Sequence, residues 1–317
     1  MRERDELGSR VAALTALAPE PPVLPPSEPS AGQTEEAWLA EVGAARVRHD
    51  AMALLLGSWW RPAQPPTLAT SVAYRDVAGL PACVYRPRAE GRRPALLVFH
   101  GGGFWMGGGA LAFTFLDPLC RRLCLELGAL VVNLDYRLAP EHRFPAQRLD
   151  GVAALAALRA EAETLAVDPE RIGVLGFSSG AHLAASVAQQ VRADLRAQAL
   201  VMPVLDVSSS QPSAQADPVW RETAVRLRQL YFGSDADLTD PAVSPLFEPS
   251  LTGVAPAFVL TAEHDPLRDD GRSYARRLSE AGVDVRHAEF PATHVAATDA
   301  VQQQMDDALL EALQEML

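Results

Sequence analysis

The chain has 317 residues, of which 48% are hydrophobic and 21% are charged, and its formal net charge is −12 at pH 7. This length predicts one large domain or two small ones. The acidic balance argues against a nucleic-acid partner, which is bound through clustered positive charge, and against an anionic membrane surface. No stretch of the sequence approaches the roughly 18 consecutive apolar residues that a membrane-spanning helix needs.

The N-terminal residues 1–66 are predicted to be mostly helical. The short apolar stretch VAALTALA is followed at once by proline-rich residues 19–29, so it is too short for a secretory signal and the prolines form an extended connector. A second helical pattern begins near Thr34, a candidate N-cap, and ends near Leu56. We expect these helices to be an appendage that precedes the first strand.

The remainder, residues 67–317, is predicted to be one α/β domain. Alternating apolar residues over 72–85 predict an antiparallel strand pair at a sheet edge. Near-continuous apolar strands joined by helices are typical of a mostly parallel sheet with helices on both faces. The predicted strands are 95–99, 129–134, 172–176, 198–202, 257–261 and 285–290, and the helices lie near 110–127, 146–160, 179–192, 267–281 and 298–316.

One connection is longer than a crossover requires. The interval between Met202 and Ala257 contains an extra helical segment. An insertion after the carboxyl end of a strand lies over the ligand crevice of such a sheet. We therefore predict that an insertion at about residues 207–240 packs with the N-terminal helices as a lid.

The strongest local signal is Gly-Phe-Ser-Ser-Gly at residues 176–180, between a predicted strand and a predicted helix. A serine on so tight a turn adopts strained backbone angles, and the flanking glycines remove side chains that would clash there. This geometry predicts Ser178 as a nucleophile. A serine that only caps the helix is the alternative. Ser179 lies one residue past the apex, so its backbone N–H is the more useful group.

A second glycine motif, His100-Gly-Gly-Gly-Phe-Trp, follows another predicted strand. Consecutive glycines let backbone N–H groups approach a carbonyl oxygen that becomes an oxyanion. A phosphate-binding loop is less consistent with the sequence, because the chain has no lysine and the glycine spacing matches neither nucleotide motif. A flexible loop without a chemical role is the structural alternative.

A nucleophilic serine needs a base, and the base needs an orienting carboxylate. His294 follows the last predicted strand, where a loop can reach Ser178, whereas His287 and His182 are expected to be structural. Asp265 follows the strand at 257–261 and precedes a helix. The chain order of serine, aspartate and histidine is that of α/β-hydrolases. Glu263 and Asp269 are alternative carboxylates.

These motifs, with NLDYRLAPEHRFPAQRLD at 133–150 and the late THV, make residues 70–317 similar to the hormone-sensitive-lipase-like branch of the α/β-hydrolases, the bacterial carboxylesterases. The resemblance implies an α/β-hydrolase fold with a helical cap. By it, Ser178 is the nucleophile, His294 the general base and acid, and Asp265 the orienting carboxylate. The backbone N–H groups of Gly102, Gly103 and Ser179 are the implied oxyanion donors.

The sequence thus predicts a serine carboxylesterase acting on a small-molecule ester with short-to-medium acyl or aryl groups, with no cofactor and no metal. Phe104, Trp105 and Phe177 belong to the two glycine motifs and are expected to contact the substrate. An amide or formamide hydrolase with the same three residues, and a non-catalytic binding protein of the same fold, are the alternatives. Three cysteines, too few for a disulfide framework, favour a cytoplasmic setting, and a homodimer is expected by analogy.

Overall fold

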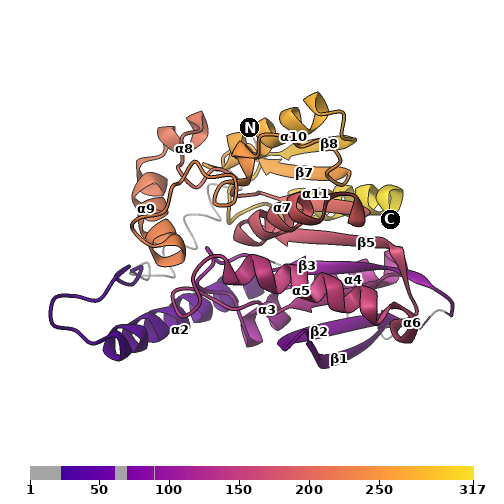
Figure 1. Cartoon of the computed structure of the whole chain (residues 1–317), viewed down its shortest axis with the longest axis horizontal. Helices are drawn as coiled ribbons and strands as arrows, with labels where there is room; N and C mark the ends of the chain where they lie inside the picture. Colours follow the sequence, from indigo (N-terminus) through magenta and orange to yellow (C-terminus); the bar gives the residue numbers. More distant parts are fainter. Residues whose placement is uncertain (1–22, 61–69, 89) are drawn as a thin grey trace.

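A computed structural model describes residues 23–60, 70–88 and 90–317, with the side chains of 54–60 excepted. Eight strands form one sheet in the order β1-β2-β4-β3-β5-β6-β7-β8 (Figure 1). Strand β2 is antiparallel to both of its neighbours, and the other adjacent pairs are parallel. The strands are β1 (Thr70–Val77), β2 (Leu80–Pro87), β3 (Arg93–Phe99), β4 (Leu130–Leu134), β5 (Val167–Phe177), β6 (Ala197–Val201), β7 (Ala257–Ala262) and β8 (Val285–Phe290).

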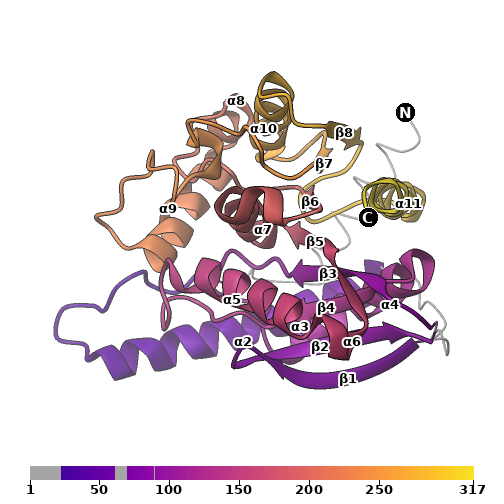
Figure 2. The same ribbon diagram turned by 45° about the vertical axis from the view of Figure 1, so that its right-hand side comes forward.

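Helices cover both faces of this sheet, as the alternation of apolar runs and amphipathic stretches predicts (Figures 1 and 2). One face is covered by α5 (Ala146–Ala160), α6 (Ala162–Leu165), α7 (Ser179–Val191) and α10 (Arg268–Glu280). The other face is covered by α4 (Asp117–Leu127) and α11 (Asp299–Met316). The predicted α/β class with a mostly parallel sheet is therefore confirmed.

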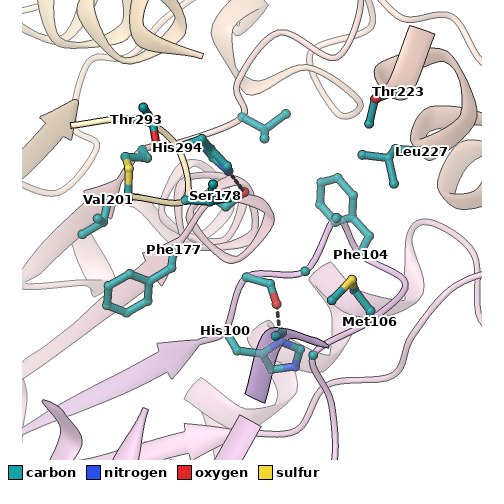
Figure 3. A pocket seen from close by; sticks show the side chains of 18 of the residues that line it. His100, Phe104, Met106, Phe177, Ser178, Val201, Thr223, Leu227, Thr293 and His294 are labelled. Atoms are coloured by element: carbon teal, nitrogen blue, oxygen red, sulfur yellow. Dashed lines mark hydrogen bonds between the residues drawn. The ribbon is translucent and has the colours of Figure 1, made fainter. Parts of the chain in front are cut away.

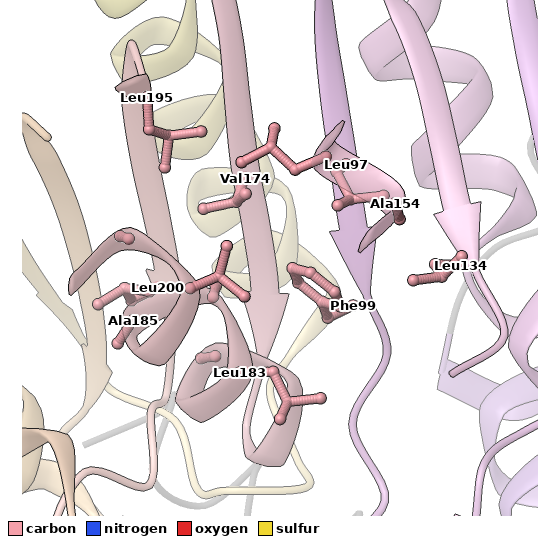
Figure 4. Close-up of a cluster of buried hydrophobic side chains, with 14 of the residues drawn as sticks. Leu97, Phe99, Leu134, Ala154, Val174, Leu183, Ala185, Leu195 and Leu200 are labelled. Atoms are coloured by element: carbon pink, nitrogen blue, oxygen red, sulfur yellow. The ribbon is translucent and has the colours of Figure 1, made fainter. Parts of the chain in front are cut away.

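The central strands are apolar throughout because both of their faces are buried. On β3, Leu97 and Phe99 pack toward α7, while Leu96 and Val98 pack toward α4 and α11, and all four are fully buried. Figure 4 shows Leu97 and Phe99 beside Val174 in the cluster under α7. Each such side chain contributes about 1.5–3 kcal/mol when removed from water. This burial holds the carboxyl ends of the parallel strands rigidly at one edge.

One helix prediction is wrong in detail. The single helix expected near 110–127 is divided into α3 (Ala110–Phe115) and α4, with Leu116 between them. Pro118 lies in the first turn of α4. A proline has no N–H to continue a preceding helix but fits the first turn of a new one, which explains the break.

Three helices lie beyond the carboxyl ends of the parallel strands: α2 (Glu35–Trp60), α8 (Pro212–Ala216) and α9 (Pro218–Phe232) (Figure 1). Trp38 and Val42 of α2 form a buried cluster with Leu230 of α9 and Trp105 of the body. The N-terminal segment and the insertion after β6 are thus packed together, although residues 1–22 and 61–69 of the expected lid and linker lie outside the described residues. Within the described ranges, no helix is both long and apolar enough to span a membrane.

Candidate active site

Ser178 occupies the turn between β5 and α7. Its backbone angles, φ 53° and ψ −116°, lie in a region that residues with side chains rarely adopt. A Cβ atom on Gly176 would lie 2.1 Å from the carbonyl oxygen of Gly180, and one on Gly180 would lie 2.2 Å from that of Phe99. Only glycine fits at either position, so the two glycines permit the tight turn that raises the Ser178 hydroxyl above the sheet edge.

The structure brings Ser178, His294 and Asp265 into one hydrogen-bonded chain. Ser178 Oγ lies 2.9 Å from His294 Nε2 (Figure 3). On the other side of the ring, His294 Nδ1 lies 2.8 Å from Asp265 Oδ2. Asp265 follows β7 and His294 follows β8, so all three residues lie just past the carboxyl ends of parallel strands. In the neutral imidazole with its proton on Nδ1, Nε2 is free to accept the serine proton.

The surroundings of Asp265 orient the imidazole. The Asp265 side chain is 1% exposed, and its second oxygen accepts a hydrogen bond of 2.8 Å from the backbone N–H of Leu267. The His294 side chain remains 23% exposed. Burial lowers the pKa of His294, but the adjacent Asp265 carboxylate opposes this effect through its charge and its hydrogen bond, and the net pKa is raised above 6.5.

The alternative carboxylates and histidines have other partners. Asp269 pairs with Arg268 at 3.0 Å and accepts a hydrogen bond from the N–H of Ser213. His182 is buried with Nδ1 3.0 Å from the carbonyl oxygen of Val204, and burial lowers its pKa to about 4. His287 lies 2.9 Å from the Thr261 hydroxyl. The structural roles expected for these two histidines agree with these contacts.

The glycine-rich segment at residues 100–109 lies directly beside Ser178. A Cβ on Gly101 would lie 3.4 Å from Ser178 Cβ. Gly102 and Gly103 have positive φ values of 129° and 57°, and neither N–H donates a hydrogen bond within the part of the chain that the structure describes. These two backbone N–H groups next to the hydroxyl are therefore available to donate hydrogen bonds to an anionic oxygen.

A pocket of about 680 Å³ opens above these groups and is lined mainly by apolar side chains (Figure 3). All three residues expected to contact substrate border it, but two are largely committed to packing. Phe104 is 4% exposed and stacks on Tyr231 at 4.0 Å, and Trp105 is 1% exposed against the ring of His49. Of the three, Phe177 is the least buried.

Sequence reasoning missed most of the pocket wall. One part comes from α9, where the lining residues recur at helical spacing, and the other comes from Leu116 and α11. The spacing on α9 was visible in the sequence and could have identified that face. No sequence pattern identifies the α11 residues, because they resemble other core side chains of that helix and differ only in reaching the pocket. The two sets are Thr223, Ala224 and Leu227 on α9, and Met305 and Leu309 on α11.

The aromatic side chains in the segments expected to form the lid are consistent either with packing or with an apolar pocket. Trp38 and Tyr231 are buried in packing, whereas Trp220 and Phe232 line the pocket. The side chains of Trp59 and Trp60 lie outside the described residues. In the described part of the chain, no group of three or more His, Cys, Asp and Glu side chains is arranged to hold a metal ion.

Comparison with known proteins agrees with this geometry. The family model for the α/β-hydrolase fold matches residues 96–297. The chain therefore belongs to the α/β-hydrolase family, as the sequence motifs predict.

Several proteins to which the chain is similar are named as esterases. The chain is similar to an ethyl acetate hydrolase of Pseudomonas putida, with 36% identity over 78% of this chain and 82% of the relative. Its identity to a carboxylesterase of Mycobacterium tuberculosis is also 36%, over 70% and 72% of the two chains. Among solved structures, a bacterial heroin esterase superimposes with a TM-score of 0.79 and 31% identity, over 96% of both chains.

Proposed function

We propose that this protein is a serine carboxylesterase, with Ser178 as the nucleophile, His294 as the general base and acid, and Asp265 as the orienting carboxylate. One observation carries the proposal: an unbroken hydrogen-bonded chain runs from the Ser178 hydroxyl to a buried carboxylate beside free backbone donors. Family membership and the ester hydrolases among its relatives support the same reaction.

The reaction proceeds through an acyl-enzyme. Neutral His294 accepts the Ser178 proton on Nε2 as Oγ attacks the ester carbonyl carbon, and the negative oxygen is held by the N–H groups of Gly102, Gly103 and Ser179. The imidazolium then protonates the departing alkoxide, so the C–O bond to the alcohol breaks. Water repeats the sequence on the acyl-enzyme, releases the carboxylic acid and restores the Ser178 hydroxyl.

The pocket supports small neutral esters with short-to-medium acyl or aryl groups. Its lining is largely apolar, and the segments of α2 and α9 above Ser178 form part of its wall. Within this proposal, residues 1–66 and the insertion at 207–240 are a helical cap that excludes water from the acyl-enzyme. Cys83, Cys120 and Cys124 are buried and form no disulfide with one another, which supports a cytoplasmic setting.

The decisive experiment compares wild type with Ser178→Ala on p-nitrophenyl acetate, butyrate and decanoate and on an aryl formamide. We expect the wild type to favour the shorter esters and the variant to lose activity on the order of 10⁴- to 10⁶-fold. Faster turnover of the formamide would replace the ester assignment with an amide hydrolase. The absence of turnover and of any phosphonate adduct on Ser178 by mass spectrometry would instead support a binding protein.

A further inference from the structure

The glycine-rich segment that bears the proposed oxyanion donors is not held by the catalytic body alone. Residues 100–109 form a tight loop, in which Gly102 accepts hydrogen bonds from the N–H groups of Trp105 at 3.2 Å and Met106 at 3.1 Å. Five residues of this loop have positive φ: Gly102, Gly103, Phe104, Gly107 and Gly109. Positive φ is unfavourable for Phe104, and the four glycines can adopt many other backbone angles, so surrounding contacts must maintain this one conformation.

The body supplies contacts at the two ends of the loop. At the start, His100 stacks on Tyr136 with ring centroids 4.2 Å apart, and the Tyr136 hydroxyl donates to the carbonyl oxygen of His100 at 2.8 Å. At the end, the N–H of Gly109 donates to Asp135 Oδ1 at 2.9 Å. Between these anchors lies the outer turn of the loop, which faces α2.

Helix α2 holds that outer turn through three residues on one helical face. Arg46 Nε donates to the carbonyl oxygen of Trp105 at 2.5 Å, and Asp50 accepts a hydrogen bond of 3.0 Å from the N–H of Gly107. The ring of His49 meets that of Trp105 edge-on, with centroids 4.9 Å apart. Residues at positions i, i+3 and i+4 share a helix face, so one face of α2 contacts the turn at both Trp105 and Gly107.

Arg46 also joins the loop to a second segment of the body. Its Nη2 atom donates to the carbonyl oxygen of Ala139 at 2.8 Å and pairs with Glu141 at 2.7 Å. The N–H of Ala139 in turn donates to the carbonyl oxygen of Phe104, at the centre of the loop. One guanidinium therefore ties the glycine loop, the segment at 139–141 and the N-terminal helix together.

Gly107, which Asp50 contacts, packs closely against the start of the loop. A Cβ on Gly107 would lie 2.5 Å from the carbonyl oxygen of Gly101 and 3.0 Å from His100 Nδ1. We therefore expect a displacement of Gly107 to disturb Gly101, the neighbour of the donor residues. Donors stabilise an oxyanion only when they are held in place before reaction, and a misplacement of about 1 Å can cost on the order of 10²-fold in rate.

From these contacts we propose that Arg46 and Asp50 are positioning residues of the oxyanion loop, so that the N-terminal helix contributes to turnover as well as to the pocket wall. This inference rests on the proposed hydrolase function. It predicts that loss of either contact lowers kcat while KM changes little, because the donors act on the transition state more than on the bound ester.

The test uses Asp50→Ala, Asp50→Asn and Arg46→Ala in the full chain, with Glu41→Gln as the matched control. Glu41 lies on the same helix, is exposed, and accepts a hydrogen bond from Gln33 away from the loop. The measurements are kcat and KM on p-nitrophenyl butyrate and the inhibition constant of an alkyl trifluoromethyl ketone, whose adduct with a serine carries an oxyanion. Melting temperatures accompany each variant.

We expect Asp50→Ala and Arg46→Ala to lower kcat about 10- to 100-fold and to weaken the ketone in parallel, with KM within about threefold. Asp50→Asn keeps an acceptor for Gly107 and should retain most of the activity, and Glu41→Gln should behave as wild type. An unchanged kcat, a change in KM alone, or ketone affinity that stays constant would overturn the inference.

Failure of the hydrolase proposal gives a different result. If wild type neither hydrolyses any ester nor forms a phosphonate adduct on Ser178, the proposed hydrolase function itself is wrong. If wild type reacts and the two alanine variants react equally fast while remaining folded, only the role assigned to Arg46 and Asp50 fails.

Discussion

The hydrogen bond between Asp265 and His294 leads to a quantitative prediction for Asp265→Asn. Both oxygens of Asp265 accept hydrogen bonds, one from His294 Nδ1 and one from the N–H of Leu267. An asparagine offers a single oxygen. If that oxygen faces Leu267, the amide NH₂ faces Nδ1 and favours the imidazole tautomer whose Nε2 carries the proton, so the base is lost. The opposite orientation leaves two buried donors facing each other.

The size of the effect follows from the geometry. Opposite unit charges 2.8 Å apart contribute about 6 kcal/mol at an effective dielectric constant of about 20. A factor of ten in rate corresponds to about 1.36 kcal/mol, so the lost stabilisation of the imidazolium amounts to about 10⁴-fold. Because His294 is 23% exposed, solvent screening reduces this, and we expect kcat/KM to fall about 10³- to 10⁴-fold.

The pH profile provides an independent check on Asp265→Asn. In wild type, kcat/KM should rise with pH through a His294 pKa above 6.5, since only the neutral imidazole accepts the serine proton. The variant lacks the charge that raises this pKa, so its rising limb should move to lower pH. The assay is p-nitrophenyl butyrate hydrolysis between pH 5 and 9, with Asp269→Asn as the control expected within about threefold of wild type. A loss of less than tenfold, or an unmoved limb, would refute the reasoning.

Three further predictions concern the stability of the fold. Gly180→Ala places a Cβ 2.2 Å from the carbonyl oxygen of Phe99 and 2.4 Å from that of His100, so the free energy of unfolding should fall by about 1–3 kcal/mol and activity should collapse. Gly43→Ala, with open space around its Cβ in α2, should instead stabilise by about 0.5–1 kcal/mol, and urea denaturation distinguishes the two. Burial depresses the pKa of His182 to about 4, so its contribution to stability is complete above about pH 6.5 and is lost as pH falls towards 4. Between these pH values, wild type should lose about 3 kcal/mol more unfolding free energy than His182→Gln; equal losses would contradict the assignment.

Much of the fold could be predicted from short sequence segments, because strand burial and turn geometry depend on the residues within each segment. Near-continuous apolar runs such as 95–99, alternating with amphipathic stretches, are typical of strands buried on both faces of a parallel sheet. The turn at Ser178 accepts no residue larger than glycine at positions 176 and 180. The division of the helix at Leu116 was missed, although Pro118 was a visible signal for it.

The meeting of His294 with Asp265, in preference to Glu263 or Asp269, and with Ser178 depends on where β5, β7 and β8 end relative to one another. His294 is 29 positions from Asp265 and 116 positions from Ser178 along the chain. No sequence pattern predicts the pocket wall on α11. The same is true of the hydrogen bonds that Arg46 and Asp50 form with the glycine loop. Sequence by itself determined which backbone conformations and which burial patterns are possible, because these depend on neighbouring residues and side-chain volume. Only the tertiary structure decided which polar groups meet, because hydrogen bonds form over about 3 Å and the packing of the whole sheet sets such distances.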